Sequence, residues 1–93
     1  MVFIGHEIVA GSNNKGDAMV TLKLTKSEGL KIELVSKFLV KYGETMDKSI
    51  RDVLGEANIA NACIRLEDYG ALDFVIKARV ETAVKRALAD KEG

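Results

Sequence analysis

The stretch AMVTLKLT, residues Ala18–Thr25, decides the expected fold because apolar and polar residues alternate along it. Ala18, Val20, Leu22 and Leu24 fall on one face, and polar side chains dominate the other. A period of two is typical of a β-strand with one buried face. The sequence therefore predicts a half-buried strand here.

Two further strands are expected beside this one. Residues Val2 to Ala10 are apolar and partly β-branched, and Leu30 to Leu34 alternate with charged residues. Only the short turn Lys26 to Gly29 separates the second strand from the third. Short connections favour neighbouring antiparallel strands, so the sequence predicts a three-stranded meander.

The apolar period then changes to that of helices, with one more strand between them. The pattern predicts a helix from about Glu44 to Ala57, with a start as early as Lys37, a strand over Asn61 to Glu67, and a helix over about Leu72 to Ala89. The apolar stripes of the two helices are expected to comprise Leu39, Tyr42, Met46, Ile50, Val53, Leu54 and Ala57, and Leu72, Ile76, Val80, Ala83, Val84 and Ala87. The expected fold is α+β, a small antiparallel sheet with two helices on one face, in the order β-β-β-α-β-α. Residues 1–93 are expected to form a single domain.

Composition excludes several classes of function. Lys plus Arg equals Asp plus Glu at 14 each, and only 5% of residues are aromatic, which argues against a nucleic-acid-binding module. No apolar run approaches the ~18 residues that span a membrane, and no secretory signal is visible. One cysteine and one histidine cannot build a disulfide or a metal cluster within the chain. The expected location is the cytoplasm, with neither a nucleic-acid nor a membrane partner.

No catalytic constellation emerges from the remaining residue types. His6 has no nucleophile or orienting carboxylate near it in sequence, and Cys63 has no basic neighbour that would lower its pKa. Asp17, Asp68 and Asp73 lie in or beside predicted turns, where acids commonly cap helices or form Asx turns. The sequence therefore favours a protein that is not itself an enzyme and that holds no metal.

Two features suggest binding instead of catalysis. The segment Gly11 to Asp17 (GSNNKGD) predicts an exposed loop, and it lacks the Gly-Lys-Ser/Thr ending of a phosphate-binding P-loop. Arg79 falls at the edge of the apolar stripe of the last helix. Its stem can cover the core while its head stays in water, or the guanidinium can make a docking or anion contact.

Four stretches carry a resemblance to a known family. They are Val9-Ala10-Gly11 with Gly16-Asp17, Ser36 with Tyr42-Gly43, Asp68-Tyr69-Gly70-Ala71-Leu72-Asp73, and Ala78-Arg79-Val80. Together they extend from about Val9 to Ala89 and resemble the acyl carrier protein, or gamma subunit, of citrate lyase.

The resemblance implies a carrier that does not itself catalyse a reaction. Members of that family hold a phosphoribosyl-dephospho-coenzyme A group, joined by a phosphodiester to a serine of the first loop. Its terminal thiol carries acetyl, which an alpha subunit exchanges for citrate and a beta subunit then cleaves. Applied to this chain, the resemblance implies alpha (acyl transferase) and beta (acyl lyase) subunits as partners and a cofactor site at Gly11, Ser12, Lys15, Gly16 and Asp17. Arg79 is a candidate docking residue for the larger subunits.

The loop departs from the family at one position. Counting from Ala10-Gly11, the modified serine corresponds to Lys15, which has no hydroxyl for a phosphodiester. Ser12 occupies the position of a threonine of the family, and it is the only hydroxyl residue between Gly11 and Asp17. Three interpretations are open: Ser12 is the acceptor after a local shift of the loop, the residue at position 15 has been substituted, or the chain is an unmodified relative with a docking or assembly role.

Overall fold

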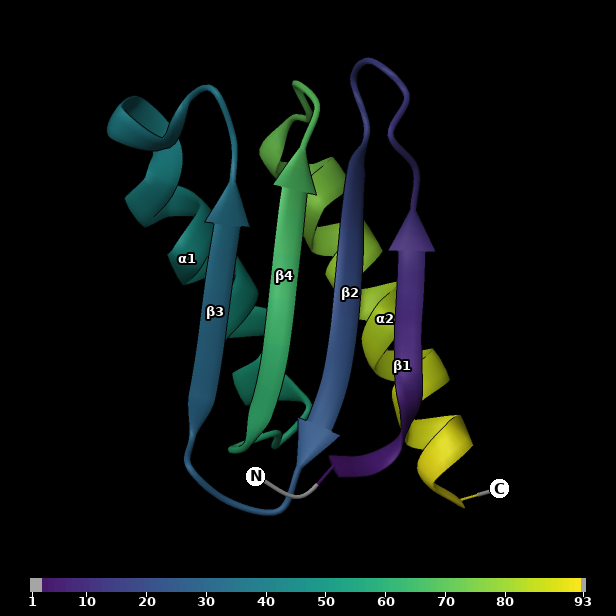
Figure 1. The fold of residues 1–93 in the computed structure, drawn as a ribbon. Helices are drawn as coiled ribbons and strands as arrows, with labels where there is room; N and C mark the ends of the chain where they lie inside the picture. The colour runs from purple at the N-terminus through teal and green to yellow at the C-terminus, as the bar shows by residue number, and fades with distance from the viewer. Residues whose placement is uncertain (1–2, 93) are drawn as a thin grey trace.

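Strands with one apolar face and two amphipathic helices assemble into a four-stranded sheet covered on one face (Figure 1). The computed structural model describes residues 3–92. Its elements are β1 (Phe3–Gly11), β2 (Ala18–Thr25), β3 (Leu30–Val35), α1 (Leu39–Glu56), β4 (Ala62–Asp68) and α2 (Asp73–Glu92). The predicted α+β class and the order β-β-β-α-β-α are confirmed, while Val2 of the predicted first strand lies outside the described residues.

The predicted meander is wrong in its strand pairing. The order across the sheet is β1-β2-β4-β3, so β4 lies between the second and third strands. β1 and β4 both run antiparallel to β2, but β3 runs parallel to β4, which makes the sheet mixed. Helix α1 carries the chain back along the sheet between β3 and β4, and such a crossover is what a parallel pair requires.

The short turn between β2 and β3 spans the start of β4. The Thr25 amide donates to the Asn61 carbonyl at 3.3 Å, and the Gly29 amide donates to Asn61 Oδ1 at 2.8 Å. The Gly29 carbonyl in turn accepts from the Ala62 amide at 3.1 Å. β2 and β3 are not paired with each other, and Asn61, just before β4, bridges the space between their ends.

The core lies between the sheet and the helices. Inward residues of the two central strands, Val20, Leu22 and Leu66 among them, have no exposed surface. Ile50 of α1 and Val80 of α2 pack against them from the helix side and are also fully buried. The predicted inward face of β2 is thus confirmed. Alternation likewise predicts Ala62, Ile64 and Leu66 on the inward face of β4, and all three are buried. The two strands with the most apolar inward faces therefore occupy the centre of the sheet.

Three residues assigned to the apolar stripes are exposed instead. Leu39 and Tyr42 belong to the start of α1, which extends past the end of β3, and Leu72 precedes α2 (Figure 1). No strand lies beneath these positions, so their side chains are 40%, 44% and 64% exposed. Neither helix within residues 3–92 combines the length and the apolarity needed to cross a bilayer.

We expect Leu22→Ala to lower the free energy of unfolding by about 2–5 kcal/mol, because it leaves a cavity at the centre of the core. Leu72→Ala is the matched control and should change it by less than about 0.5 kcal/mol, since that side chain is mostly exposed. Urea unfolding followed by circular dichroism measures both. Equal effects of the two substitutions would contradict this account of the core.

Candidate functional site

Three connections meet at one end of the sheet, which we call the loop end. They are the β1–β2 loop (residues 12–17), the β3–α1 linker (36–38) and the β4–α2 turn (69–72) (Figure 1). They gather there because β1, β3 and β4 all run toward this end. Residues 13–16 of the β1–β2 loop are exposed, as expected for a segment that projects beyond the sheet.

The Asp17 carboxylate anchors the base of this loop. Its Oδ1 accepts from Arg79 Nε at 2.8 Å and from the Ala18 amide at 2.7 Å, and its Oδ2 accepts from Ser12 Oγ at 2.6 Å. The Arg79 guanidinium, the Ser12 hydroxyl and the Ala18 amide together hold the pKa of Asp17 well below its usual range. From the sequence, the Arg79 head group was expected either in water or in a docking or anion contact, and the anion that it contacts is Asp17 of the same chain.

Gly11 lets the loop and α2 approach this closely. It has a φ of +91°, and a Cβ placed on it would lie 1.9 Å from the Ala18 carbonyl oxygen and 3.1 Å from Cδ of Arg79. Any other residue would therefore be strained and would push against both neighbours. The absence of a side chain at Gly11 therefore allows β1 to lie close to both β2 and α2.

A second set of hydrogen bonds ties the loop to the β4–α2 turn. The Gly16 amide donates to the Tyr69 carbonyl at 2.7 Å, and the Tyr69 amide donates to the Asp17 carbonyl at 3.0 Å. Asp68 fixes the turn itself, since its Oδ1 accepts from the Gly70 and Ala71 amides at 3.0 and 2.9 Å. The base of the loop is thus held on two sides, while its tip projects.

The structure places the two candidate attachment residues differently. The Ser12 hydroxyl is half-buried at the base of the loop, where it donates to Asp17 and accepts from the Asn14 amide at 3.3 Å. Lys15 lies at the exposed tip, and its ammonium makes no ion pair with any residue in the range 3–92. Ser12, which has a hydroxyl, is therefore turned inward, and Lys15, at the tip of the loop, has no hydroxyl.

Two other residues considered from the sequence lie away from the loop end. His6 binds the Asp90 carboxylate with its amide at 2.6 Å and its Nδ1 at 2.9 Å, and this hydrogen bond raises the pKa of His6. The contact joins β1 to the end of α2 and has a structural explanation. Cys63 lies on the sheet face that the helices leave open.

Two adjoining cavities open at the loop end. The first, of about 520 Å³, is lined by Asn13, Lys15, Gly16, Lys37 and Tyr69, and we call it the lysine groove. The second, of about 390 Å³, is lined by Tyr42, Met46, Ala71, Leu72, Asp73 and Ile76, and we call it the apolar hollow. Phe38, Asp68 and Gly70 line both, so the two cavities adjoin.

Exposed apolar side chains concentrate around these cavities. Nine large apolar residues in the described part of the chain are exposed, and most of them lie at the loop end. Those at the loop end are Val35, Phe38, Leu39, Val40, Tyr42, Leu72 and Phe74. A cluster of this kind marks a surface that contacts another molecule more often than an ordinary surface does.

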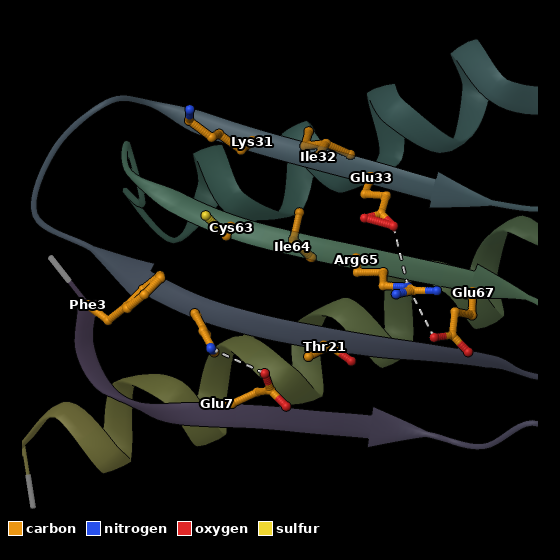
Figure 2. A pocket seen from close by; sticks show the side chains of 11 residues that line it. Phe3, Glu7, Thr21, Lys31, Ile32, Glu33, Cys63, Ile64, Arg65 and Glu67 are labelled. Carbon is orange, nitrogen blue, oxygen red and sulfur yellow. Dashed lines mark ion pairs between the residues drawn. The ribbon is translucent and has the colours of Figure 1, made fainter. Parts of the chain in front are cut away.

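The open sheet face carries a larger hollow of about 550 Å³, but its charges are mostly satisfied within it (Figure 2). Arg65 lies 3.2 Å from Glu67 and 3.6 Å from Glu33, and Lys23 lies 3.5 Å from Glu7. These pairs cross between neighbouring strands and stabilise the sheet modestly. The loop end, with its unpaired lysines and exposed aromatic rings, is the better candidate for the functional site.

Sequence reasoning missed two contributors to the loop end. Lys37 carried no signal, because nothing in the local pattern around it shows that it lines the same groove as Lys15. Asp68 was interpreted as a turn acid, and it also accepts from Ser36 Oγ of the β3–α1 linker at 2.8 Å. No group of three or more His, Cys, Asp or Glu side chains within residues 3–92 is arranged to hold a metal ion.

Comparison with known proteins identifies the class to which this fold and loop belong. Residues 5–87 match the family of acyl carrier proteins described as malonate decarboxylase delta subunit (MdcD). The chain belongs to this family.

Curated relatives carry a related description. The citrate lyase acyl carrier protein of Treponema denticola is 42% identical over 84 residues, covering 90% of this chain and 94% of the relative. The protein of the same description from Halothermothrix orenii is 40% identical, covering 84% of this chain and 82% of the relative. The resemblance noted from the sequence is thereby confirmed.

A solved structure has the same fold. A chain in the crystal structure of a Pseudomonas malonate decarboxylase hetero-tetramer in complex with malonate superposes with a TM-score of 0.66. The match covers 92% of this chain and 88% of that one at 15% sequence identity. It shows that the arrangement of the strands and helices is shared.

We expect Gly11→Ala to lower the free energy of unfolding by at least about 2 kcal/mol, because the new Cβ meets a backbone carbonyl at a positive φ. Gly43→Ala is the matched control, since its Cβ would meet only Leu39 Cδ2 at an ordinary 3.8 Å. Because Gly43 lies within helix α1, Gly43→Ala should raise the free energy of unfolding by up to about 1 kcal/mol. Denaturant unfolding measures the stability of both variants. A Gly11→Ala variant as stable as wild type would contradict the close approach of Gly11 to Ala18 and Arg79.

We expect Arg79→Met to raise the pKa of Asp17 toward its ordinary value, because it removes the hydrogen bond that lowers this pKa most. Carboxyl ¹³C NMR titration measures the pKa, with Arg51→Met, on the far surface of α1, as control. A carboxyl group whose pKa is lower in the folded state stabilises the fold at pH values above its unfolded pKa, which is about 3.9 for aspartate. The stability difference between wild type and Arg79→Met should therefore shrink as the pH falls below about 4.

Proposed function

We propose that this chain is a non-catalytic acyl carrier subunit of a multi-subunit lyase or decarboxylase complex. The observation that carries the proposal is a projecting loop whose base is fixed by Asp17 while its tip is exposed. Relatives that match nearly the whole chain are described as acyl carrier proteins, which supports the same role. A loop mounted on a rigid sheet can enter the pocket of another subunit without disturbing the core.

The acyl group is proposed to travel as a thioester on a covalently attached phosphoribosyl-dephospho-coenzyme A arm. Such an arm raises the local concentration of the acyl group at successive active sites, which here would belong to an acyl transferase (alpha) subunit and an acyl lyase (beta) subunit. The carrier would position the arm and leave the chemistry to its partners.

Ser12 is the attachment residue under this proposal, because it has the only hydroxyl between Gly11 and Asp17. Its fit is partial, since the hydroxyl is half-buried and donates to Asp17. The low pKa of Asp17 makes that carboxylate a weak base, so the serine proton would pass to a group on the transfer enzyme. Gly11 and Gly16 would shape the loop around the attachment point.

One observation favours a second function. Lys15, not a serine, occupies the exposed tip, and under this second function Ser12 stays inward and the chain carries no arm. It would then act as an unmodified interaction or assembly subunit that docks on the same larger subunits. Under either function, Arg79 contributes through its hold on Asp17.

Intact-mass spectrometry after co-expression with the transfer enzymes of the family separates the two functions. We expect a mass increment in wild type and in Ser27→Ala, a serine of the distant β2–β3 turn, and none in Ser12→Ala. Fragmentation should place the added group within residues 11–17. An unmodified wild type combined with a modified Lys15→Ser variant would contradict the carrier and favour the assembly subunit, since docking to the transfer enzyme would then survive without the acceptor.

A further inference from the structure

The lysine groove begins beside the tip of the loop and continues into the apolar hollow. Lys15 and Gly16 belong to the groove, and Phe38 and Gly70 form the boundary that leads to the hollow, where Leu72 lies. A molecule attached to the loop, or one that binds beside it, would meet charged groups first and an apolar surface next.

Lys15 and Lys37 are the charged side chains of these cavities that remain without an ion pair in the described structure. The two acids that share the cavities are already engaged. Asp68 accepts from Ser36 Oγ and from two turn amides, and Asp73 accepts from Ser49 Oγ and lies 3.7 Å from Lys77 Nζ. The groove therefore presents two lysines against the single carboxylate of Asp68, and this excess of positive charge is complementary to a phosphate.

The hollow offers apolar surface to whatever follows the phosphate. Met46 and Ile76 form a buried floor, and the exposed side chains of Phe38, Tyr42 and Leu72 surround it. The Phe38 and Tyr42 rings pack edge to face with centroids 6.5 Å apart, so the wall they form is preorganised. An alkyl or acyl chain placed there would leave water without ordering new side chains.

We propose that the lysine groove and the apolar hollow together form a binding site for an organic phosphate with an apolar chain. The phosphate lies between Lys15 and Lys37, and the chain extends past Phe38 toward Leu72. This chemistry has two sources: the phosphorylated arm of the carrier folded back on its own body, or a free acyl thioester of the coenzyme A type. The proposal rests on the carrier function only for the first source.

The site would hold the arm against the body of the carrier between transfers when the arm is attached. In a chain that carries no arm, it would hold the same chemistry without a covalent bond, and Lys15 would then be a ligand-binding residue in place of an attachment residue. The open sheet face is less suited, because Arg65 and Lys23 there are paired with acids and Lys31 is the one lysine or arginine of its lining without an ion pair within residues 3–92.

The first test is a titration of ¹⁵N-labelled protein with 4′-phosphopantetheine, and with pantetheine, which lacks the phosphate. We expect the phosphorylated probe to bind about tenfold more tightly and to shift the amides of Gly16, Phe38, Gly70 and Leu72. Amide shifts confined to other parts of the molecule, or equal affinities of the two probes, would overturn the proposal.

Charge reversal tests the lysines directly. Lys37→Glu should weaken 4′-phosphopantetheine about tenfold, because it replaces an attraction by a repulsion. Lys26→Glu makes the same change of net charge in the exposed turn at the opposite end of the sheet and should stay within about twofold of wild type (Figure 1). Equal weakening by both variants would mean that only the net charge matters and would refute the site.

A neutral pair of variants tests the hollow with butyryl-coenzyme A as the probe. Leu72→Ser removes apolar surface from the hollow and should weaken binding about fivefold. Phe74→Ser removes an equally exposed apolar side chain that lines neither cavity, and it should leave the affinity within about twofold. No difference between the two variants would exclude the hollow as the site of the chain.

The same spectra separate this site from the carrier function. If the protein accepts the arm but the amides of the groove are unchanged between the unmodified and modified forms, and free probes do not bind, the site is refuted while the carrier stands. If the protein takes up no arm but binds 4′-phosphopantetheine in the groove, the site stands while the covalent carrier is refuted.

Discussion

The three hydrogen bonds of the Asp17 carboxylate are the constraint on which the loop end depends. They join the loop through Ser12, the first residue of β2 through Ala18, and helix α2 through Arg79. Because these contacts come from separate parts of the chain, the base of the loop is fixed relative to both layers of the fold. The tip, at Lys15, takes part in none of them and projects from a rigid mount.

The insertion of β4 between β2 and β3 has an equally direct consequence for this end of the molecule. The short β2–β3 turn reverses the chain, so β3 ends, with Lys37 and Phe38 just after it, at the same end as the β1–β2 loop. The inserted β4 then brings its own turn, with Asp68 and Gly70, between that loop and the β3–α1 linker. The two cavities beside the loop therefore follow from the topology of the sheet, and not from the loop alone.

The sequence was sufficient for the features that depend on local pattern. The alternation around Leu22 and the helical stripe around Ile50 identified every element, its type and the inward faces of the central strands. It was not sufficient for pairing, because a four-residue turn can connect adjacent strands or span the end of a third, and the local pattern is the same in both cases. Here the turn spans the start of β4, where it contacts Asn61. The Asp17–Arg79 contact was equally hidden, since it joins residues 62 positions apart.

The lysines of this neutral protein are unevenly distributed, and two of them without ion pairs in the described structure lie at the loop end. The formal net charge is zero, so the unpaired lysines at positions 15 and 37 must be balanced by negative charge elsewhere on the surface. Helix α1 reinforces this asymmetry, because its positive amino-terminal end lies at the same place with no acid in its first turn. This end of the molecule therefore carries a local positive potential. During diffusion an acidic partner would rotate it loop first, and added salt would slow their encounter without changing the contacts that follow.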